Sequence, residues 1–139
     1  TALYAQGEDL HIALWPGNVY NTADITRFSA REGRSYVMSV SSVLRRADIP
    51  ESLPHYDVLM ASLPDVMANG GSCIASPDGV WLREPVLHDE CLVIADIDHA
   101  RVREERQNFD ATGHYGRPDV LQLTVDRTRQ TTATFRDEQ

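Results

Sequence analysis

The chain of 139 residues contains only two cysteines, Cys73 and Cys91, and their spacing fits neither a disulfide framework nor a metal-binding motif. Its apolar runs are strand-length pieces such as residues 92–95, well short of the about 20 residues that span a bilayer. No basic and apolar leader is visible. From these features we expect a protein of the reducing cytoplasm, with no membrane partner.

Positive charge is also scarce, because 13 basic residues face 21 acidic ones and the net charge is −8. Nucleic acids and anionic membranes select a basic surface, so neither is expected as the main partner. No two histidines have a zinc-like spacing and no Cys-x-x-Cys motif accompanies them, so no metal site or cofactor is expected. The five histidines are His11, His55, His88, His99 and His114.

The order of the apolar stretches predicts a layered α/β architecture. Strands are expected at 10–16, 36–44, 72–76, 80–86 and 91–98, with helices from Asn21 or Thr22 to Gly33 and at 56–63 and 99–107. Residues 91–98 are the most strand-like of all, and residues 121–126 alternate as an edge strand does. Ile25 and Phe28 form the expected apolar stripe of the first full helix. Residues 2–6, closed by Gly7, read as the last turn of a helix that begins upstream.

Cys73 lies in the stretch GGSCIASPDG and is the first candidate nucleophile. A reactive cysteine needs a partner that lowers its thiol pKa and an exposed bend. Cys73 is instead followed by a hairpin turn and another strand, and GGSCI is not a Gly-x-Ser-x-Gly elbow, so Ser72 is a poor nucleophile too. We therefore expect Cys73, and by the same argument Cys91, to be small core residues in strands.

Two other groups of residues have a functional and a structural interpretation. Asp96 and Asp98 share one face of a strand and could serve acid–base chemistry, but a helix cap at Asp98 and an arginine partner for Asp96 are preferred. Trp15 and Pro16 stand where a strand leaves the sheet, which is where layered α/β folds place ligand pockets. The position of Trp15 alone is equally consistent with a role in a pocket wall and with a role in packing only.

Five stretches taken together, in their order and spacing, resemble the carboxyl-terminal half of nitrilases, in the carbon–nitrogen hydrolase superfamily. They are ALYAQGEDLHIALWPG, SAREGRSYVMSVSSVLRR, NGGSCIASPDG, LVIADID and GHYGRPDVLQL. The resemblance implies an α-β-β-α sandwich, of which this chain would be an incomplete half. Residues 1–98 would be the end of the hydrolase domain, and residues 99–139 a helix, a tail strand and a mobile end.

The resemblance also implies an activity, the hydrolysis of a nitrile to a carboxylic acid and ammonia without metal or organic cofactor. Nitrilases use a Cys nucleophile, a Glu base and a Lys, and all three would lie upstream of Thr1, so this chain alone is expected to be inactive. Trp15 and Pro16 match a loop that lines the substrate pocket. Phe28 to Arg34 match a helix at the main dimer contact, and residues 113–125 a tail that crosses between subunits of a homo-oligomer.

Two alternatives stay open at this stage. The chain could be a short, non-catalytic half-domain that binds a full-length subunit, or part of an amidase or a cyanide-converting relative. In either case, half of a four-layer sandwich would leave apolar sheet surface and an edge unpaired. We therefore expect the isolated chain to associate rather than to behave as a monomer.

Overall fold

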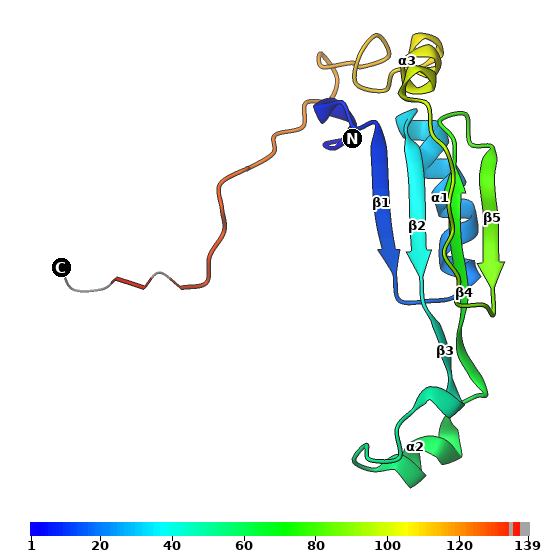
Figure 1. The fold of residues 1–139 in the computed structure, drawn as a ribbon. Coiled ribbons are helices and arrows are strands. Elements are labelled where there is room, and N and C mark those ends of the chain that lie inside the picture. The colour runs from blue at the N-terminus through cyan, green and yellow to red at the C-terminus, as the bar shows by residue number, and fades with distance from the viewer. Residues whose placement is uncertain (134, 137–139) are drawn as a thin grey trace.

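A computed structural model describes residues 1–133 and 135–136, and it is a mixed α/β structure built on one five-stranded sheet (Figure 1). The strands are β1 (Leu10–Trp15), β2 (Tyr36–Ser41), β3 (Val43–Arg45), β4 (Val66–Ala75) and β5 (Trp81–Leu87). The helices are α1 (Val19–Gly33), α2 (Tyr56–Ser62) and α3 (His99–Asn108), with 3-10 turns at Tyr4–Gln6 and Arg46–Asp48. The α/β class predicted from the sequence is confirmed.

The sheet begins with a β1–α1–β2 unit, in which the two strands are parallel and α1 makes the crossover. Strand β2 pairs antiparallel with β4, and β4 turns back into β5, so the main sheet has the order β1-β2-β4-β5. The short turn at Tyr4–Gln6 ends at Gly7, whose φ of 77° is left-handed, as the sequence predicts for a helix end. Strand β4 starts earlier than predicted, because its first residues pair with β3.

Helix α1 covers one face of β2, β4 and β5 through small side chains rather than through an apolar stripe. Its buried residues are Thr22, Thr26, Ala30 and Gly33, and the core beneath it contains Ala30, Val37 and Ala75 with Trp81 packed against them. The predicted stripe is wrong, because Ile25 and Phe28 face outward and are exposed. Close approach to the sheet favours small residues on the inner side of the helix.

The opposite face of the sheet, which we call the open face, has no helix of the described residues over it (Figure 1). The side chains of Ile12 and Leu14 on β1 and of Val40 on β2 point to this face, and Leu14 is 78% exposed. Strand residues alternate between faces, so their neighbours Ala13 and Ser39 point toward the α1 side. The sheet is therefore covered on one side and largely bare on the other.

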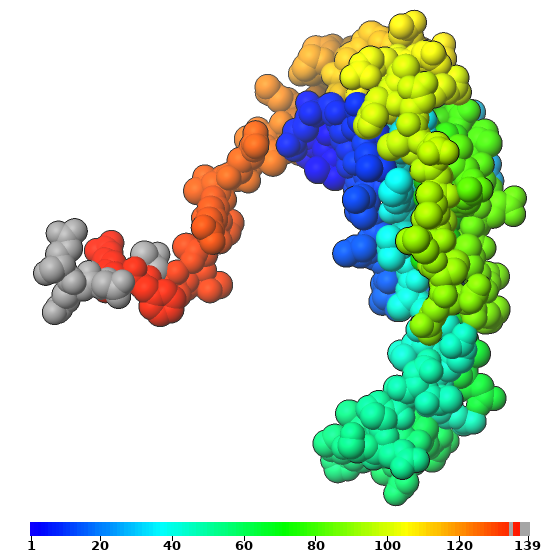
Figure 2. Space-filling model, in the orientation of Figure 1, coloured from blue at the N-terminus to red at the C-terminus, as the bar shows by residue number. Residues whose placement is uncertain are grey.

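Residues 91–98, predicted to be the clearest strand, are not part of any sheet. The segment is extended and runs along the open face, in front of β4 in Figure 1 and over the sheet in Figure 2. Its burial alternates as in a strand, with Val93, Ala95 and Ile97 half-buried and Leu92 and Ile94 exposed. The predicted extended conformation is therefore present, but the predicted pairing with a neighbouring strand is not. Residues 121–126 form no strand either.

Residues 43–66 form an arm that leaves the sheet at its lower end (Figure 1). The arm consists of β3, a 3-10 turn, α2 and the start of β4, and no residue of α2 is buried. Helix α2 agrees with the prediction for residues 56–63. The polar, mobile end, which the sequence predicts from Arg127 onward, includes residues 134 and 137–139, which lie outside the described residues.

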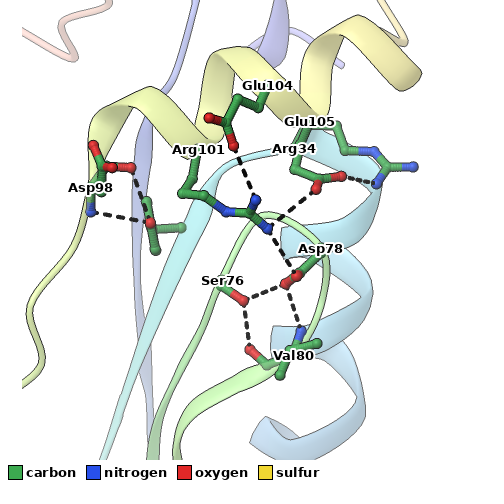
Figure 3. Close-up of polar contacts among 9 residues, drawn as sticks. Arg34, Ser76, Asp78, Val80, Asp98, Arg101, Glu104 and Glu105 are labelled. Carbon is green, nitrogen blue, oxygen red and sulfur yellow. Dashed lines mark hydrogen bonds and ion pairs between the residues drawn. The ribbon is translucent and has the colours of Figure 1, made fainter.

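Helix α3 is held at the other end of the sheet by ion pairs to Asp9 before β1, to the β4–β5 turn and to the end of α1, and Figure 3 shows the last two. Asp98 caps this helix as predicted, since its Oδ1 accepts a hydrogen bond of 2.9 Å from Ala100 N. The arginine partner predicted for Asp96 is not found, because Asp96 makes no ion pair among the described residues. Arg101 reaches Asp78 in the β4–β5 turn at 3.4 Å, and Glu105 reaches Arg34 at the end of α1 at 3.1 Å. Helix α3 therefore joins the hairpin to α1.

Candidate functional site

The carboxyl ends of β1 and β2 are the edge at which the sequence predicts a pocket wall. After Trp15 the chain turns sharply through Pro16 and Gly17 into α1. Gly17 has a φ of 124°, and a Cβ there would lie 2.4 Å from the Cβ of Ala68, so only glycine fits this turn. Asn18, not Asn21 or Thr22, is the N-cap of α1, because its side chain accepts a hydrogen bond from Tyr20 N.

The indole of Trp15 is fixed by a chain of hydrogen bonds that ends on α1. Trp15 Nε1 donates to Ser39 Oγ at 3.1 Å, and Ser39 Oγ lies 2.5 Å from Thr26 Oγ1. Thr26 in turn donates to the carbonyl of Thr22 at 2.5 Å, so the Ser39 hydroxyl is free to donate to Thr26. Every donor in this series of hydrogen bonds has an acceptor. The indole is therefore held in one orientation at the end of the sheet.

Two further side chains tie the β1–α1 turn to its neighbours. The side-chain oxygen of Asn69, on β4, accepts a hydrogen bond of 2.9 Å from Val19 N at the start of α1. The hydroxyl of Ser42 donates to the Pro16 carbonyl at 2.8 Å. The sequence did not mark Asn69, Ser39 or Thr26 as site residues, since polar residues inside a strand or a helix carry no local signal of which backbone group they will meet.

Cys73 lies in β4, is 1% exposed and points toward α1. Burial raises the pKa of its thiol, although hydrogen bonding with Thr26 and Thr22 lowers it in part. A buried thiol with a raised pKa is a poor nucleophile, so the prediction of a structural role agrees with the structure. The matching prediction for Cys91 is wrong, because Cys91 is exposed in the unpaired segment.

A cavity of about 470 Å³ lies on the open face beside this edge. It is lined by Val40 to Val43, Gly70, Ser72, Val86 and residues 89–93, and it does not include Trp15 or Pro16. The Ser72 hydroxyl is bound to the backbone of Ser41, and no lysine occurs anywhere in the chain. This cavity therefore contains carboxylates, hydroxyls and the exposed thiol of Cys91, and its lining includes no histidine or lysine that could act as a base beside that thiol.

Within the described part of the chain, no three His, Cys, Asp or Glu side chains gather closely enough to hold a metal ion. In the same residues, no helix has the length and apolar character needed to cross a membrane. Neither observation identifies a further functional group at the carboxyl edge of the sheet. What the described residues provide there is a fixed indole and a rigid turn, within an α/β structure that is bare on one side.

The comparisons with known proteins agree on one class. No family profile matches the chain. Nitrilase 2 of Arabidopsis thaliana is 36% identical over 97% of this chain, but the match covers 41% of that protein. An aliphatic nitrilase of Sinorhizobium fredii (strain HH103) is 35% identical over 91% of the chain and 40% of its own length. An arylacetonitrilase of Aspergillus kawachii is 31% identical over 88% of the chain and 40% of its own length.

By its sequence, the chain is thus similar to one part of a hydrolase. More closely, the chain matches one part of a nitrilase, and it spans about 40% of the length of the curated relatives that it matches. The resemblance predicted from five stretches of the sequence is confirmed.

Proposed function

We propose that residues 1–139 are the carboxyl-terminal part of a nitrilase that converts a nitrile to a carboxylic acid and ammonia. The observation that carries this proposal is the similarity to nitrilases over nearly the whole chain but only about 40% of theirs. The chain has no lysine, and its strand cysteine is buried. The Cys, Glu and Lys that the resemblance implies would come from the rest of the protein, and 1–139 alone would be inactive.

The space beside α1 fits an upstream helix that would deliver the nucleophile. Among the described residues, no helix makes extensive contact with strand β1. A cavity of about 240 Å³ opens there, lined by Thr1 to Tyr4, His11, Ser29, Ser35 and Val37. The Ser35 hydroxyl is buried without a hydrogen-bond partner among the described residues. A helix packed in this space would cover the cavity.

Such a helix would run back from Thr1 antiparallel to β1. The six residues of β1 span about 20 Å, which about 13 helical residues would match. Its N-terminus would then lie near Trp15, at the carboxyl edge of the sheet. A helix N-terminus stabilises a thiolate, so a cysteine there would have the lowered pKa that Cys73 lacks.

In this mechanism the thiolate adds to the nitrile carbon and gives a thioimidate. Water adds to it and ammonia leaves, which gives a thioester, and a second water releases the acid. A carboxylate base would carry the protons, and a lysine would stabilise the charge that develops on nitrogen and oxygen. From this chain, Trp15 and Pro16 would form a rigid wall against the substrate's side chain, with the indole orientation set by Ser39.

The complete protein is expected to be a cytoplasmic homo-oligomer with the α-β-β-α sandwich of carbon–nitrogen hydrolases. Exposed Tyr20, Ile25 and Phe28 make the outer side of α1 a suitable dimer contact. The exposed apolar residues of the tail, Val120, Leu121 and Leu123, would pack against a neighbouring subunit.

The first test is the intact mass and N-terminal sequence of the natural protein, captured with an antibody to this segment. A longer chain with an upstream nucleophile that releases ammonia from nitriles would support the proposal. A natural chain that begins near Thr1 would reject it and favour a non-catalytic half-domain. Release of cyanide-derived products, or of ammonia from amides only, would favour the cyanide-converting or amidase relatives.

The role of Trp15 is tested in the complete protein with Trp15→Ala. We expect the ratio of kcat/KM for aromatic and aliphatic nitriles to change by about tenfold, because a pocket wall is lost. Trp81→Ala is the matched control, since Trp81 packs on the core beside Arg27 and is remote from the β1–α1 turn. An unchanged ratio in Trp15→Ala would leave the tryptophan with a packing role only.

A further inference from the structure

We propose that Ser39 and Thr26 are positioning residues for the nitrilase reaction, which hold the N–H of the Trp15 indole inside the fold and leave only carbon atoms of the ring for the substrate. This inference rests on the proposed function, in which Trp15 lines the substrate pocket. It goes further, because it gives a role to two buried hydroxyls that would not touch the substrate. It also names the chemical group that this arrangement disfavours, which is a hydrogen-bond acceptor on the nitrile beside Trp15.

The indole of Trp15 has a single polar group, the N–H, which can only donate a hydrogen bond. That group donates to Ser39 Oγ at 3.1 Å, and Ser39 is 2% exposed. The residue opposite Ser39 on β1 is Ala13, whose small side chain leaves room for the indole. The N–H edge of the ring therefore points into the fold, and the accessible part of this half-buried side chain is carbon.

Thr26 determines that Ser39 accepts from the indole. A hydroxyl donates one hydrogen bond and accepts two. Thr26, which is 1% exposed, donates to the Thr22 carbonyl at 2.5 Å, and its Oγ1 also contacts Ser39 Oγ at 2.5 Å and the Cys73 thiol at 3.5 Å. With its own proton used, Thr26 accepts from Ser39. Ser39 then has no proton for any other partner, and its lone pair is available to the indole N–H.

Other polar groups of the β1–α1 turn are also occupied within the fold. The carbonyl of Pro16 accepts a hydrogen bond of 2.8 Å from the Ser42 hydroxyl, and the carbonyl of Gly17 accepts one of 2.9 Å from the Asn21 side chain. The N–H of Val19 donates to a side chain of β4. A substrate acceptor held against Trp15 would lose its hydrogen bond to water and find no donor among these groups, which disfavours its binding.

The kinetic test compares Ser39→Ala with the unmodified complete protein. The probes are benzonitrile and the three cyanopyridines, which have the same shape but carry a ring nitrogen that accepts a hydrogen bond. Without the Ser39 hydroxyl, the buried N–H loses its acceptor and the ring can turn to offer it to the substrate. We expect the kcat/KM of at least one cyanopyridine, relative to benzonitrile, to rise about fivefold in Ser39→Ala, which is the effect of one neutral hydrogen bond.

The same comparison is made with hexanenitrile and its ether analogue, in which oxygen replaces one methylene, so that an enzyme restricted to aliphatic nitriles is also tested. Each ratio is referred to the unmodified protein, which cancels the difference in chemical reactivity between the two probes. The gain should lie in KM rather than in kcat, because a contact remote from the nitrile carbon binds substrate and transition state alike.

Fluorine NMR reports the orientation of the indole directly. The tryptophans of the complete protein are replaced by a fluorinated analogue, and Trp15→Phe identifies the resonance of Trp15. We expect one sharp resonance in the unmodified protein and a split or broadened one in Ser39→Ala. Thr26→Val should have the same effect, since it removes the acceptor of the Ser39 proton, and Thr26→Ser should restore the single resonance, since it keeps the hydroxyl.

Ser76→Ala is the matched control. Ser76 is 8% exposed and its hydroxyl donates to the Val80 carbonyl at 2.9 Å, at the end of the sheet remote from Trp15. This variant also loses a buried hydroxyl, but we expect the Trp15 resonance and the substrate ratios to stay as in the unmodified protein. If Ser39→Ala does not fold, Thr26→Val and Thr26→Ser supply the same comparison.

The outcomes separate this inference from the proposed function. A complete protein that releases no ammonia from any nitrile rejects the proposed function, and the Trp15 resonance then still decides whether the two hydroxyls position the indole. In a protein that hydrolyses nitriles, a single sharp resonance and unchanged ratios in Ser39→Ala overturn the inference and leave the function standing. A split resonance with unchanged ratios overturns the selection against acceptors.

Discussion

Ser39 and Val40 are neighbours on β2, yet they face two different environments. Ser39 is buried toward α1 in a hydrogen-bond chain that links Trp15 to Thr26, while Val40 faces the open side and is half exposed. The covered side is rich in small and hydroxyl-bearing residues, and the bare side carries branched apolar ones. Side-chain polarity alone would therefore predict the wrong face of the sheet to be buried. Burial depends instead on whether a side chain fits against α1 and whether its hydrogen-bond donors are paired.

The difference between the faces also indicates how much stability the bare side lacks. Burying one large aliphatic side chain contributes about 1.5–3 kcal/mol, and Ile12, Leu14 and Val40 are all largely in water. A chain that leaves several such side chains exposed gains free energy from any apolar cover. The covered face holds this part of the fold together, and we expect the open face to be the surface through which it associates.

The largest effect is expected from a charge on the covered face. Val37 is 1% exposed and belongs to the core with Ala30 and Ala75. Val37→Asp would bury a carboxylate without a partner, so we expect a loss of about 3–5 kcal/mol in the free energy of unfolding, enough to unfold the chain. Far-UV circular dichroism at a fixed protein concentration measures it. A folded Val37→Asp chain would show that the α1 side is not a closed core.

The two cysteines provide a natural comparison of the buried and exposed positions. Cys73 is buried with a raised thiol pKa, and Cys91 is exposed. Because alkylation requires an accessible thiolate, we expect iodoacetamide at pH 8 to modify Cys73 at least about 100-fold more slowly than Cys91. Peptide mass spectrometry gives both rates, and equal rates in urea are the control. Fast modification of Cys73 in the folded chain would reopen its candidacy as a nucleophile.

A charge on the open face should act on association rather than on folding. Leu14 points into solvent, so Leu14→Asp should keep the secondary structure and weaken self-association of the isolated chain by about tenfold or more. Analytical ultracentrifugation measures the association constant. The control is Val58→Asp, a similarly exposed apolar position on the arm, at α2. If the isolated chain sediments as a stable monomer, the open face is not an association surface.

The sequence predicts elements better than it predicts contacts, and individual residues show why. The hairpin at Pro77 and Asp78, the cap at Asp98 and the strand at Leu10–Trp15 follow from local chemistry, and all are present. The cap of α1 shifted from Asn21 or Thr22 to Asn18, because the positive φ of Gly17 sets where the helix starts. Three capping residues within five positions give no local preference that could decide this.

The features that the sequence did not predict correctly depend on partners that lie far away along the chain. Ile25 and Phe28 repeat at helical spacing, which is a sound apolar pattern, but they face outward because the sheet accepts only small residues such as Ala30. Residues 91–98 have every local property of a strand and no neighbour to pair with in the described residues. Asn69 and Ser39 act through contacts 24 to 50 residues away, which no local pattern encodes.

The smallest predicted effect concerns Asp78, which holds the hairpin turn on the covered side to α3. Partial burial would raise the pKa of this carboxyl, but hydrogen bonds from Ser76 and Val80 and the charge of Arg101 lower it overall. Its stabilising contribution is therefore present above the ordinary pKa of about 4 and is lost as the pH falls through the lower folded value. Asp78→Asn keeps the turn acceptor and removes the charge.

We expect Asp78→Asn to cost at most about 0.5 kcal/mol at pH 7, because the ion pair with Arg101 is partly screened by solvent. The difference from the unmodified chain should shrink toward zero as the pH drops below the folded pKa, and urea unfolding at several pH values measures it. Glu104→Gln is the control, since Glu104 pairs with Arg101 within α3 and joins no second element. A cost that stays constant down to acidic pH would show that the turn geometry, not the charge, holds the hairpin to α3.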